Sequence, residues 1–198
     1  MGTVRRAVVI TCLHGFLGLP RDWDFLREAG FLIETPPLHA IPPRGDVLLG
    51  YSMGGRRALR ALGGYKRAVI VSARVTAPEP DRPDWSRRFE SEPWDTLMRD
   101  WNAQPIFGGH AMPRDERDFD RRELVRQWRD FASAAFSGPL PIPTLFVAGA
   151  RDPKYVAEAE IAVGRWLLAE MWICPDAAHR VPWEQPELFI ERLRQFVE

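Results

Sequence analysis

Short apolar runs and segments with helical spacing alternate along this chain. Runs rich in β-branched and large apolar residues predict strands at residues 4–13, 31–34, 47–51, 68–72, 144–148 and 171–174. Helical spacing predicts helices near 23–29, 53–62, 156–166 and 188–197, and it places Val156, Ala159, Val163 and Trp166 on one helix face. This alternation predicts a parallel sheet covered on both faces, with ligands bound beyond the carboxyl ends of its strands.

Residues 76–138 interrupt the alternation. They hold half of the eight tryptophans and many charged residues, but no strand-like run. Two helices fit the segment, one through Trp94, Leu97, Met98 and Trp101, and one through Leu124, Trp128, Phe131, Ala132 and Ala135. We therefore expect a core of residues 1–75 and 139–198, with 76–138 as a helical cap insertion.

Composition narrows the range of partners. The chain carries 27 basic and 27 acidic residues, so no overall field would hold it on nucleic acid or an anionic membrane, and neither is expected as a partner. Apolar stretches fall short of spanning length, which predicts a soluble, cytoplasmic protein. Cys12 and Cys174 sit in β-like runs and are expected to be buried free thiols, and no metal is implied.

The motif Gly50-Tyr51-Ser52-Met53-Gly54 joins a predicted strand to a predicted helix. In that context G-x-S-x-G is typical of a nucleophile elbow, where small neighbours let a strained serine project its hydroxyl. The alternative is a glycine-rich turn with an incidental serine. The motif predicts an α/β-hydrolase fold: a mostly parallel sheet with helices on both faces, here with an abbreviated core and a helical cap insertion.

A serine nucleophile in this fold needs a carboxylate and then a histidine later in the chain. Asp152 follows a strand-like run, and His179 follows the last predicted strand, so both would lie at carboxyl ends. The alternatives are a turn aspartate before Pro153 and a solvated loop histidine. We expect Ser52, Asp152 and His179 to form a catalytic triad.

Negative charge on a reaction intermediate would require N–H donors held in place. This fold takes one from the residue after the serine and one from the loop after an early strand. These are Met53 and Phe16, and Gly15 would let the backbone approach closely, although His14-Gly15 is also an ordinary turn.

Nearly end to end, the chain resembles the MenH-type synthases of menaquinone biosynthesis, which form 2-succinyl-6-hydroxy-2,4-cyclohexadiene-1-carboxylate (SHCHC) by eliminating pyruvate. The motifs that carry the resemblance are Leu13-His14-Gly15-Phe16-Leu17-Gly18, Gly50-Tyr51-Ser52-Met53-Gly54-Gly55-Arg56, Trp101-Asn102-Ala103-Gln104-Pro105-Ile106-Phe107, Arg121-Arg122-Glu123-Leu124-Val125, Gly149-Ala150-Arg151-Asp152-Pro153-Lys154-Tyr155 and Ala177-Ala178-His179.

The resemblance implies the same triad and a substrate pocket lined by Tyr51, Arg56 and Trp101, with Gln104 as a further member. A small substrate bearing carboxylates would be held by guanidinium groups, and Arg56 lies one helical turn beyond the serine. The alternatives are a solvated Arg56 and a Trp101 that belongs to the core of the insertion.

Two features depart from the family. The family has further pocket arginines in the insertion. At one of these positions this chain has Trp128, flanked by Arg126 and Arg129. The other position falls near Pro78, where Arg74 and Arg82 are the candidate substitutes for the missing arginine. Between the second and third strands stands a twelve-residue stretch with four prolines, residues 35–46, in place of a longer loop and helix. Prolines forbid a regular helix there, so we predict an extended crossover that presses Leu38 and Ile41 onto a less covered sheet face, a candidate homodimer contact.

The resemblance and the triad predict an SHCHC-synthase-like lyase that needs no metal or organic cofactor. A serine hydrolase acting on a small ester or thioester would use the same residues. The third hypothesis is a non-catalytic binding protein that has kept the fold. The presence of all three triad residues argues against it.

Overall fold

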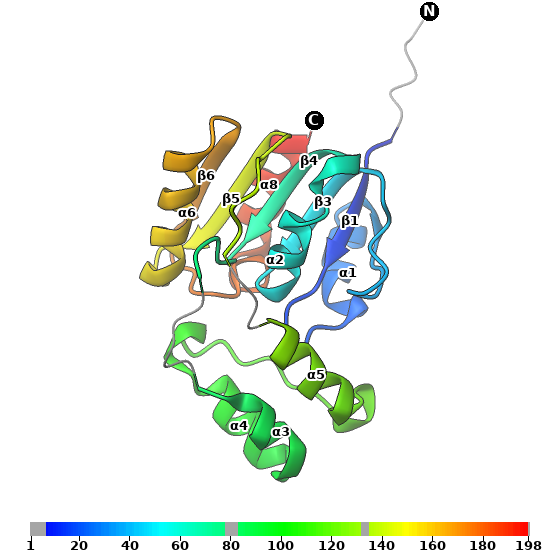
Figure 1. The fold of residues 1–198 in the computed structure, drawn as a ribbon, viewed down its shortest axis with the longest axis vertical. Helices are drawn as coiled ribbons and strands as arrows, with labels where there is room; N and C mark the ends of the chain where they lie inside the picture. The colour runs from blue at the N-terminus through cyan, green and yellow to red at the C-terminus, as the bar shows by residue number, and fades with distance from the viewer. Residues whose placement is uncertain (1–6, 78–82, 132–134, 198) are drawn as a thin grey trace, which may run out of the picture.

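The computed structural model describes residues 7–77, 83–131 and 135–197. In these ranges one sheet of six strands has the order β2-β1-β3-β4-β5-β6 (Figure 1). The strands are β1 (Val9–Leu13), β2 (Leu32–Glu34), β3 (Gly45–Tyr51), β4 (Tyr65–Val71), β5 (Thr144–Gly149) and β6 (Ala169–Cys174). Every neighbouring pair is parallel, which confirms the predicted sheet.

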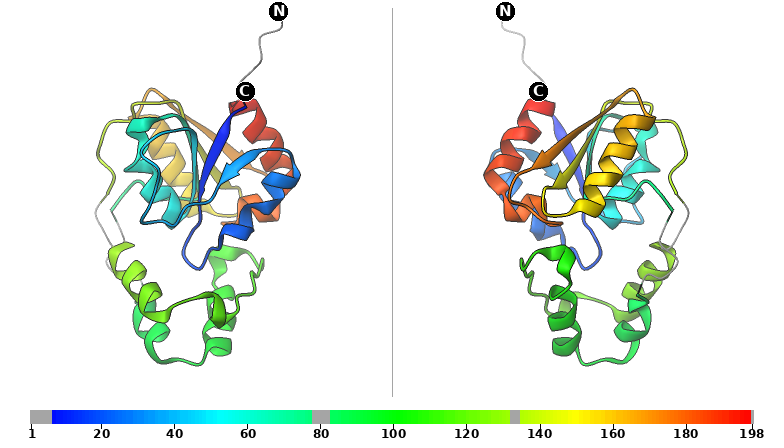
Figure 2. Two further views of the ribbon diagram at one scale, coloured as in Figure 1. Left: turned by 90° about the vertical axis from the view of Figure 1, so that its right-hand side faces the viewer. Right: turned by 90° about the vertical axis from the view of Figure 1, so that its left-hand side faces the viewer.

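Helices cover both faces of the sheet (Figure 2). The helices of the core are α1 (Asp24–Glu28), α2 (Met53–Leu59), α6 (Pro153–Arg165), α7 (Val181–Glu184) and α8 (Pro186–Val197), with short 3-10 turns η1 (Pro20–Trp23) and η2 (Leu62–Gly64). Side chains of α2 and α6 pack in one apolar cluster, and those of α1, α7 and α8 pack in another on the opposite face.

Central strands are apolar at consecutive positions because both of their faces are buried. In β3, Leu49 belongs to the cluster under α8 while the neighbouring Leu48 belongs to the cluster under α2, and neither is exposed to solvent. Burying a side chain of this size contributes about 1.5–3 kcal/mol. The buried sheet therefore holds the loops at the carboxyl ends of its strands in place.

The Pro-rich crossover contains no regular helix, as predicted. Residues 35–44 run without helix or strand from β2 to β3, which β1 separates in the sheet. Leu38 is buried and Ile41 is partly buried, and both pack against the cluster that includes Leu48. These two side chains therefore cover the strip of sheet that a helix would otherwise protect. The homodimer contact on this face remains a prediction.

In the described residues between β4 and β5, three helices lie beyond the carboxyl ends of the strands (Figure 1). They are α3 (Trp85–Ser91), α4 (Trp94–Asn102) and α5 (Arg121–Phe131), with 3-10 turns η3 (Pro105–Phe107) and η4 (Glu116–Asp118). We refer to these three helices and the turns that connect them as the cap. The predicted α4 and α5 are present, although Ala132 lies outside the described residues and Ala135 lies beyond the helix.

The sequence reading missed α3. This helix has only seven residues, with Trp85 and Phe89 as its large apolar positions. Asp84 caps it by accepting a hydrogen bond from the Ser86 amide. Such a short helix is stable here because Trp85 and Phe89 are buried against α4 and α5, a tertiary contribution that local spacing does not reveal.

The apolar face predicted for α6 is not buried along its whole length. Val163 is 38% exposed, whereas Glu158 is buried. The Glu158 carboxylate accepts hydrogen bonds from the amides of Val75 and Thr76, at 2.8 and 2.9 Å. A buried carboxylate is tolerated where backbone donors satisfy it. Glu158 can therefore be buried because the chain that leaves β4 supplies two amide donors.

The predicted burial of the thiols is confirmed, since Cys12 and Cys174 are both buried and free. Burial raises the pKa of the Cys12 thiol and raises that of Cys174 to about 11. None of the helices in the described ranges is long and apolar enough to cross a membrane.

Candidate active site

Ser52 stands at the sharp turn between β3 and α2. Its φ of +53° and ψ of −112° are unusual for a residue with a side chain. A Cβ atom on Gly50 would lie 2.6 Å from the Gly54 carbonyl oxygen, and one on Gly54 would lie 2.4 Å from that of Leu13. Only glycine fits at these two positions, so the motif packs the turn tightly and leaves the Ser52 hydroxyl facing the cavity.

His179 lies between the other two residues predicted for the triad. Its Nδ1 is 2.8 Å from Asp152 Oδ2, and its Nε2 is 3.2 Å from Ser52 Oγ. A carboxylate only accepts hydrogen bonds, so Nδ1–H donates to Asp152 and Nε2 accepts from the serine hydroxyl. His179 is 4% exposed and Asp152 is 3% exposed. This is the arrangement expected if Ser52 is a nucleophile, His179 its base and Asp152 the orienting acid.

The loop after β1 passes directly beside the serine. A Cβ atom on Gly15 would lie 2.8 Å from two Tyr51 ring carbons and 3.3 Å from the Ser52 Cβ. Phe16 and Met53 both line the cavity next to Ser52. Their amides belong to the two segments that flank the hydroxyl, which is the placement expected of oxyanion donors.

A cavity of about 670 Å³ opens at Ser52, between the carboxyl ends of the strands and the cap. Arg56 and Arg74 line it and are 4% and 7% exposed. Arg74 donates from Nη1 to the Ala77 carbonyl at 3.1 Å, and its Nε lies 3.9 Å from Glu158 Oε1. Because Arg56 is buried at the cavity wall, the alternative of a solvated helix residue is excluded.

Aromatic rings from the cap form the opposite wall. Trp101 and Trp128 are buried and line the cavity with Trp85. Phe16 reaches into this group, with ring centroids 5.3 Å from Trp101 and 5.2 Å from Trp128. Trp101 is therefore both a core residue of the cap and a wall of the cavity.

Gln104 and Tyr51 also line the cavity. Gln104 Nε2 donates to the Trp101 carbonyl at 3.0 Å, which holds the amide at the end of α4. Tyr51 packs edge-on against Trp183 and 5.5 Å from the His179 ring, and burial raises its pKa.

The substitutes considered for the missing cap arginines lie in different places. Arg126 and Arg129 are exposed and pair with Glu123 and Glu90, so they do not reach the cavity. Pro78 and Arg82 lie outside the described residues. Arg74 is the one of these arginines that the structure places at the cavity wall.

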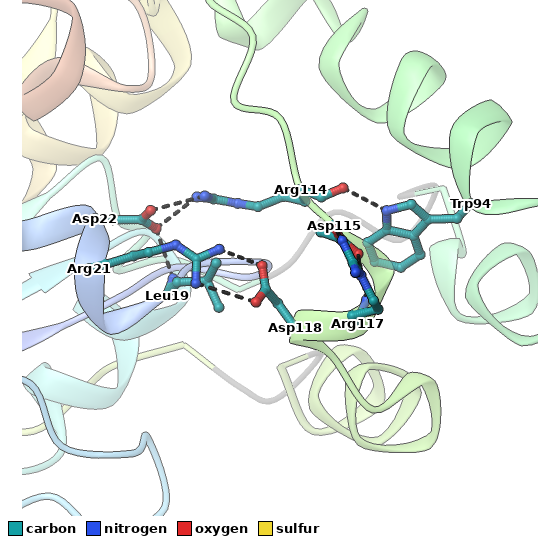
Figure 3. Close-up of polar contacts among 8 residues, drawn as sticks. All are labelled: Leu19, Arg21, Asp22, Trp94, Arg114, Asp115, Arg117 and Asp118. Atoms are coloured by element: carbon teal, nitrogen blue, oxygen red, sulfur yellow. Dashed lines mark hydrogen bonds and ion pairs between the residues drawn. The ribbon is translucent and has the colours of Figure 1, made fainter.

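Two arginines that line the cavity, Arg114 and Arg180, join the cap to the core. From the cap, Arg114 forms a bidentate pair with Asp22 at 2.9 and 2.7 Å, and its carbonyl accepts from the Trp94 indole at 2.7 Å (Figure 3). From the core, Arg180 Nη1 donates to Asn102 at 2.9 Å, and its guanidinium lies 3.7 Å from the Phe107 ring centre.

Sequence reasoning missed Arg114, Arg180 and Tyr155. The Tyr155 ring centre lies 4.5 Å from that of His179, and burial raises the Tyr155 pKa to about 12. Tyr155 belongs to the motif around Asp152 that resembles the family, so the sequence could have identified it. No sequence pattern points to Arg114 or Arg180, because their partners are distant in sequence. Among the described residues, no group of His, Cys, Asp and Glu is arranged to hold a metal ion.

Comparisons with known proteins identify the same fold. The chain is 29% identical to the SHCHC synthase of Escherichia coli O7:K1, across 85% of this chain and 73% of that enzyme. The structure of MenH from S. aureus superposes with a TM-score of 0.75 at 18% identity, covering 98% of this chain and 95% of that one. An esterase from Exiguobacterium antarcticum gives 0.74 at 15% identity, with coverages of 96% and 92%. A family model described as "Alpha/beta hydrolase family" matches residues 3–192, so the chain belongs to that family.

Proposed function

We propose that this protein is an SHCHC-synthase-like lyase that eliminates pyruvate from a carboxylate-bearing substrate. The observation that carries the proposal is the continuous contact from Asp152 through His179 to Ser52, at the floor of a cavity walled by buried arginines. The relatives with the same activity cover most of the chain, which supports the same substrate class.

In this mechanism His179 withdraws the proton of the Ser52 hydroxyl, and the serine oxygen removes a proton from substrate carbon. The electron pair left on the substrate then expels the enolate of pyruvate, which takes up the proton held by the His179 imidazolium, so that pyruvate is released and the neutral imidazole is restored. Asp152 keeps Nε2 facing the serine and balances the charge of the imidazolium. The amides of Phe16 and Met53 stabilise the developing negative charge. Every step uses groups of the protein chain.

Charge complementarity supports an anionic substrate. Arg56 and Arg74 stand at the cavity wall, and Tyr155 adds a protonated hydroxyl whose pKa burial raises to about 12. Guanidinium groups bind carboxylates through paired hydrogen bonds, which hold several substrate carboxylates in one orientation. We infer that these residues, with Tyr51, Trp101 and Gln104, bind the substrate.

A direct assay tests the proposal. Purified protein is mixed with the succinylated cyclohexene precursor, and pyruvate release is followed together with diene absorbance. The expected result is stoichiometric appearance of pyruvate and the diene, lost in Ser52→Ala. Absence of pyruvate with wild-type protein at high concentration would refute the lyase.

A serine hydrolase for a small ester or thioester is the second candidate. The aromatic wall of Trp85, Trp101 and Trp128 favours it, because it offers an apolar surface to an acyl chain. In this case Ser52 attacks a carbonyl and forms an acyl-enzyme. A burst of product from an activated ester, with acylation of Ser52 seen by mass spectrometry, would establish the hydrolase.

A further inference from the structure

One carboxylate binds the backbone on both sides of His179. Glu184 Oε2 accepts a hydrogen bond from the Ala178 amide at 2.8 Å, and Glu184 Oε1 accepts from the Arg180 amide, also at 2.8 Å. The Glu184 side chain is 4% exposed. The carboxylate therefore spans the loop that presents the histidine.

The local sequence explains how the carboxylate reaches this position. Helix α7 begins at Val181, directly after the loop, and Pro182 in its first turn fixes a helical φ. Glu184 is the last residue of this one-turn helix, and its side chain points back at the amides before the helix, as a capping carboxylate does. Val181 and Pro182 are buried and anchor the helix to the core.

The remaining contacts of the loop come from other elements. The His179 amide donates to the Ile106 carbonyl of the cap at 3.2 Å, and the Arg151 amide donates to the Ala177 carbonyl at 2.8 Å. A Cβ atom on Gly149 would lie 2.1 Å from the Ala178 carbonyl oxygen, so strand β5 packs directly on the loop. Only the carboxylate of Glu184 contacts amides on both sides of the histidine among the described residues that bind this loop.

We propose that Glu184 is a positioning residue that fixes His179 between Ser52 and Asp152. This role rests on the proposed function of His179 as the base. The Ser52 contact is already the longer of the two histidine contacts, at 3.2 Å against 2.8 Å, so displacement of the loop would weaken it first. A misplacement of this kind costs roughly 10- to 100-fold in rate.

The test measures how fast a fluorophosphonate probe labels Ser52. Glu184→Gln keeps the side-chain volume, but its NH2 group cannot accept from an amide, so one of the two amide contacts is lost. The variant also removes the charge that pairs with the exposed Arg151, whose Nη2 lies 3.1 Å from Glu184 Oε2. We expect the maximal labelling rate to fall about 10- to 100-fold while the probe concentration for half-maximal rate is unchanged. Glu187→Gln, on the exposed surface of α8, is the matched control and should label like wild type.

A double-mutant cycle separates positioning from a general structural role. In the His179→Ala background, Glu184→Gln should have no further effect on the residual rate, because Glu184 acts only through the histidine. An additional loss of the same size would overturn the proposal, as would wild-type labelling by Glu184→Gln alone.

The same labelling experiment distinguishes failure of the proposed function from failure of the Glu184 proposal. If wild type does not label, or if His179→Ala labels as fast as wild type, the triad itself is refuted. Should Glu184→Gln not fold, Glu184→Asp takes its place: it keeps the charge, but its shorter side chain cannot reach both amides. A cooperative unfolding transition for each variant confirms that labelling is measured on folded protein.

Discussion

At the scale of single residues, the strained backbone of Ser52 is the feature on which the site depends. A positive φ at a residue with a side chain costs about 1–3 kcal/mol, and here the tight packing of Gly50 and Gly54 against neighbouring backbone maintains it. The glycine spacing around this serine is visible in the sequence, which is why the sharp turn at Ser52 could be predicted. The contact with His179, 127 residues away, depends on the assembled sheet.

Ser52→Ala and His179→Ala should each reduce turnover by roughly a thousandfold or more while the protein stays folded. The double variant should be little worse than either single variant, because the two groups act as one unit. Steady-state kinetics alongside far-UV circular dichroism measure both quantities. Independent, multiplicative losses of turnover in the double variant would refute the triad assignment.

Arg56→Ala should lower turnover of an anionic substrate by about 10- to 100-fold, because a charge-assisted hydrogen bond contributes about 1.5–3 kcal/mol. Turnover of a neutral activated ester should change far less, since the guanidinium acts on substrate charge. Arg57→Ala on the same helix, which does not line the cavity, is the control. Equal losses on both substrates would make Arg56 merely structural.

At the scale of elements, the chain between α4 and α5 decides how the cap meets the core. This connection carries Arg114, whose partner Asp22 lies in η1, and Ile106, whose carbonyl binds the histidine loop. Helices α4 and α5 could be predicted from their apolar spacing. The docking contacts could not, because each joins residues far apart in sequence whose types alone do not select one another.

Asp22→Asn should lower the free energy of unfolding by about 3 kcal/mol, since it leaves a largely buried guanidinium without its ion pair. Asp118→Asn is the matched comparison, because its partner Arg21 is exposed and screened by solvent (Figure 3). That variant should change stability little. Urea titration measures both, and equal destabilisation would contradict the buried pair as the anchor.

At the scale of the whole molecule, the sheet brings three distant loops to one edge. Ser52 follows β3, Asp152 follows β5 and His179 follows β6, and all three strands run in the same direction. Several of the exposed large apolar side chains lie around the end of α6 and along β6, among them Leu167, Leu168 and Met171, while Leu32 lies in β2 and Leu188 in α8. The crossover presents mainly Ile41 as a partly covered apolar residue.

We predict that two copies of the chain associate through the crossover. Wild type should sediment as a dimer at high concentration, and Ile41→Glu should shift it toward monomer because a charge would be buried in the contact. Leu167→Glu, at the distant α6–β6 turn, should leave the dimer intact. A wild type that stays monomeric at every concentration, measured by analytical ultracentrifugation, removes the dimer.

The parallel sheet, the tight turn at Ser52, the chain order of Ser52, Asp152 and His179, and the helix-free crossover could all be predicted from the sequence. Each follows from local rules: apolar runs, glycine spacing and prolines act within a few residues. Tertiary structure decided what local rules leave open. It stabilised the short α3, turned Glu158 of α6 inward to bind two amides, placed Arg74 at the cavity wall, and set Glu184 against the histidine loop. In each case the deciding partner is a group from another element, and burial makes that partner obligatory.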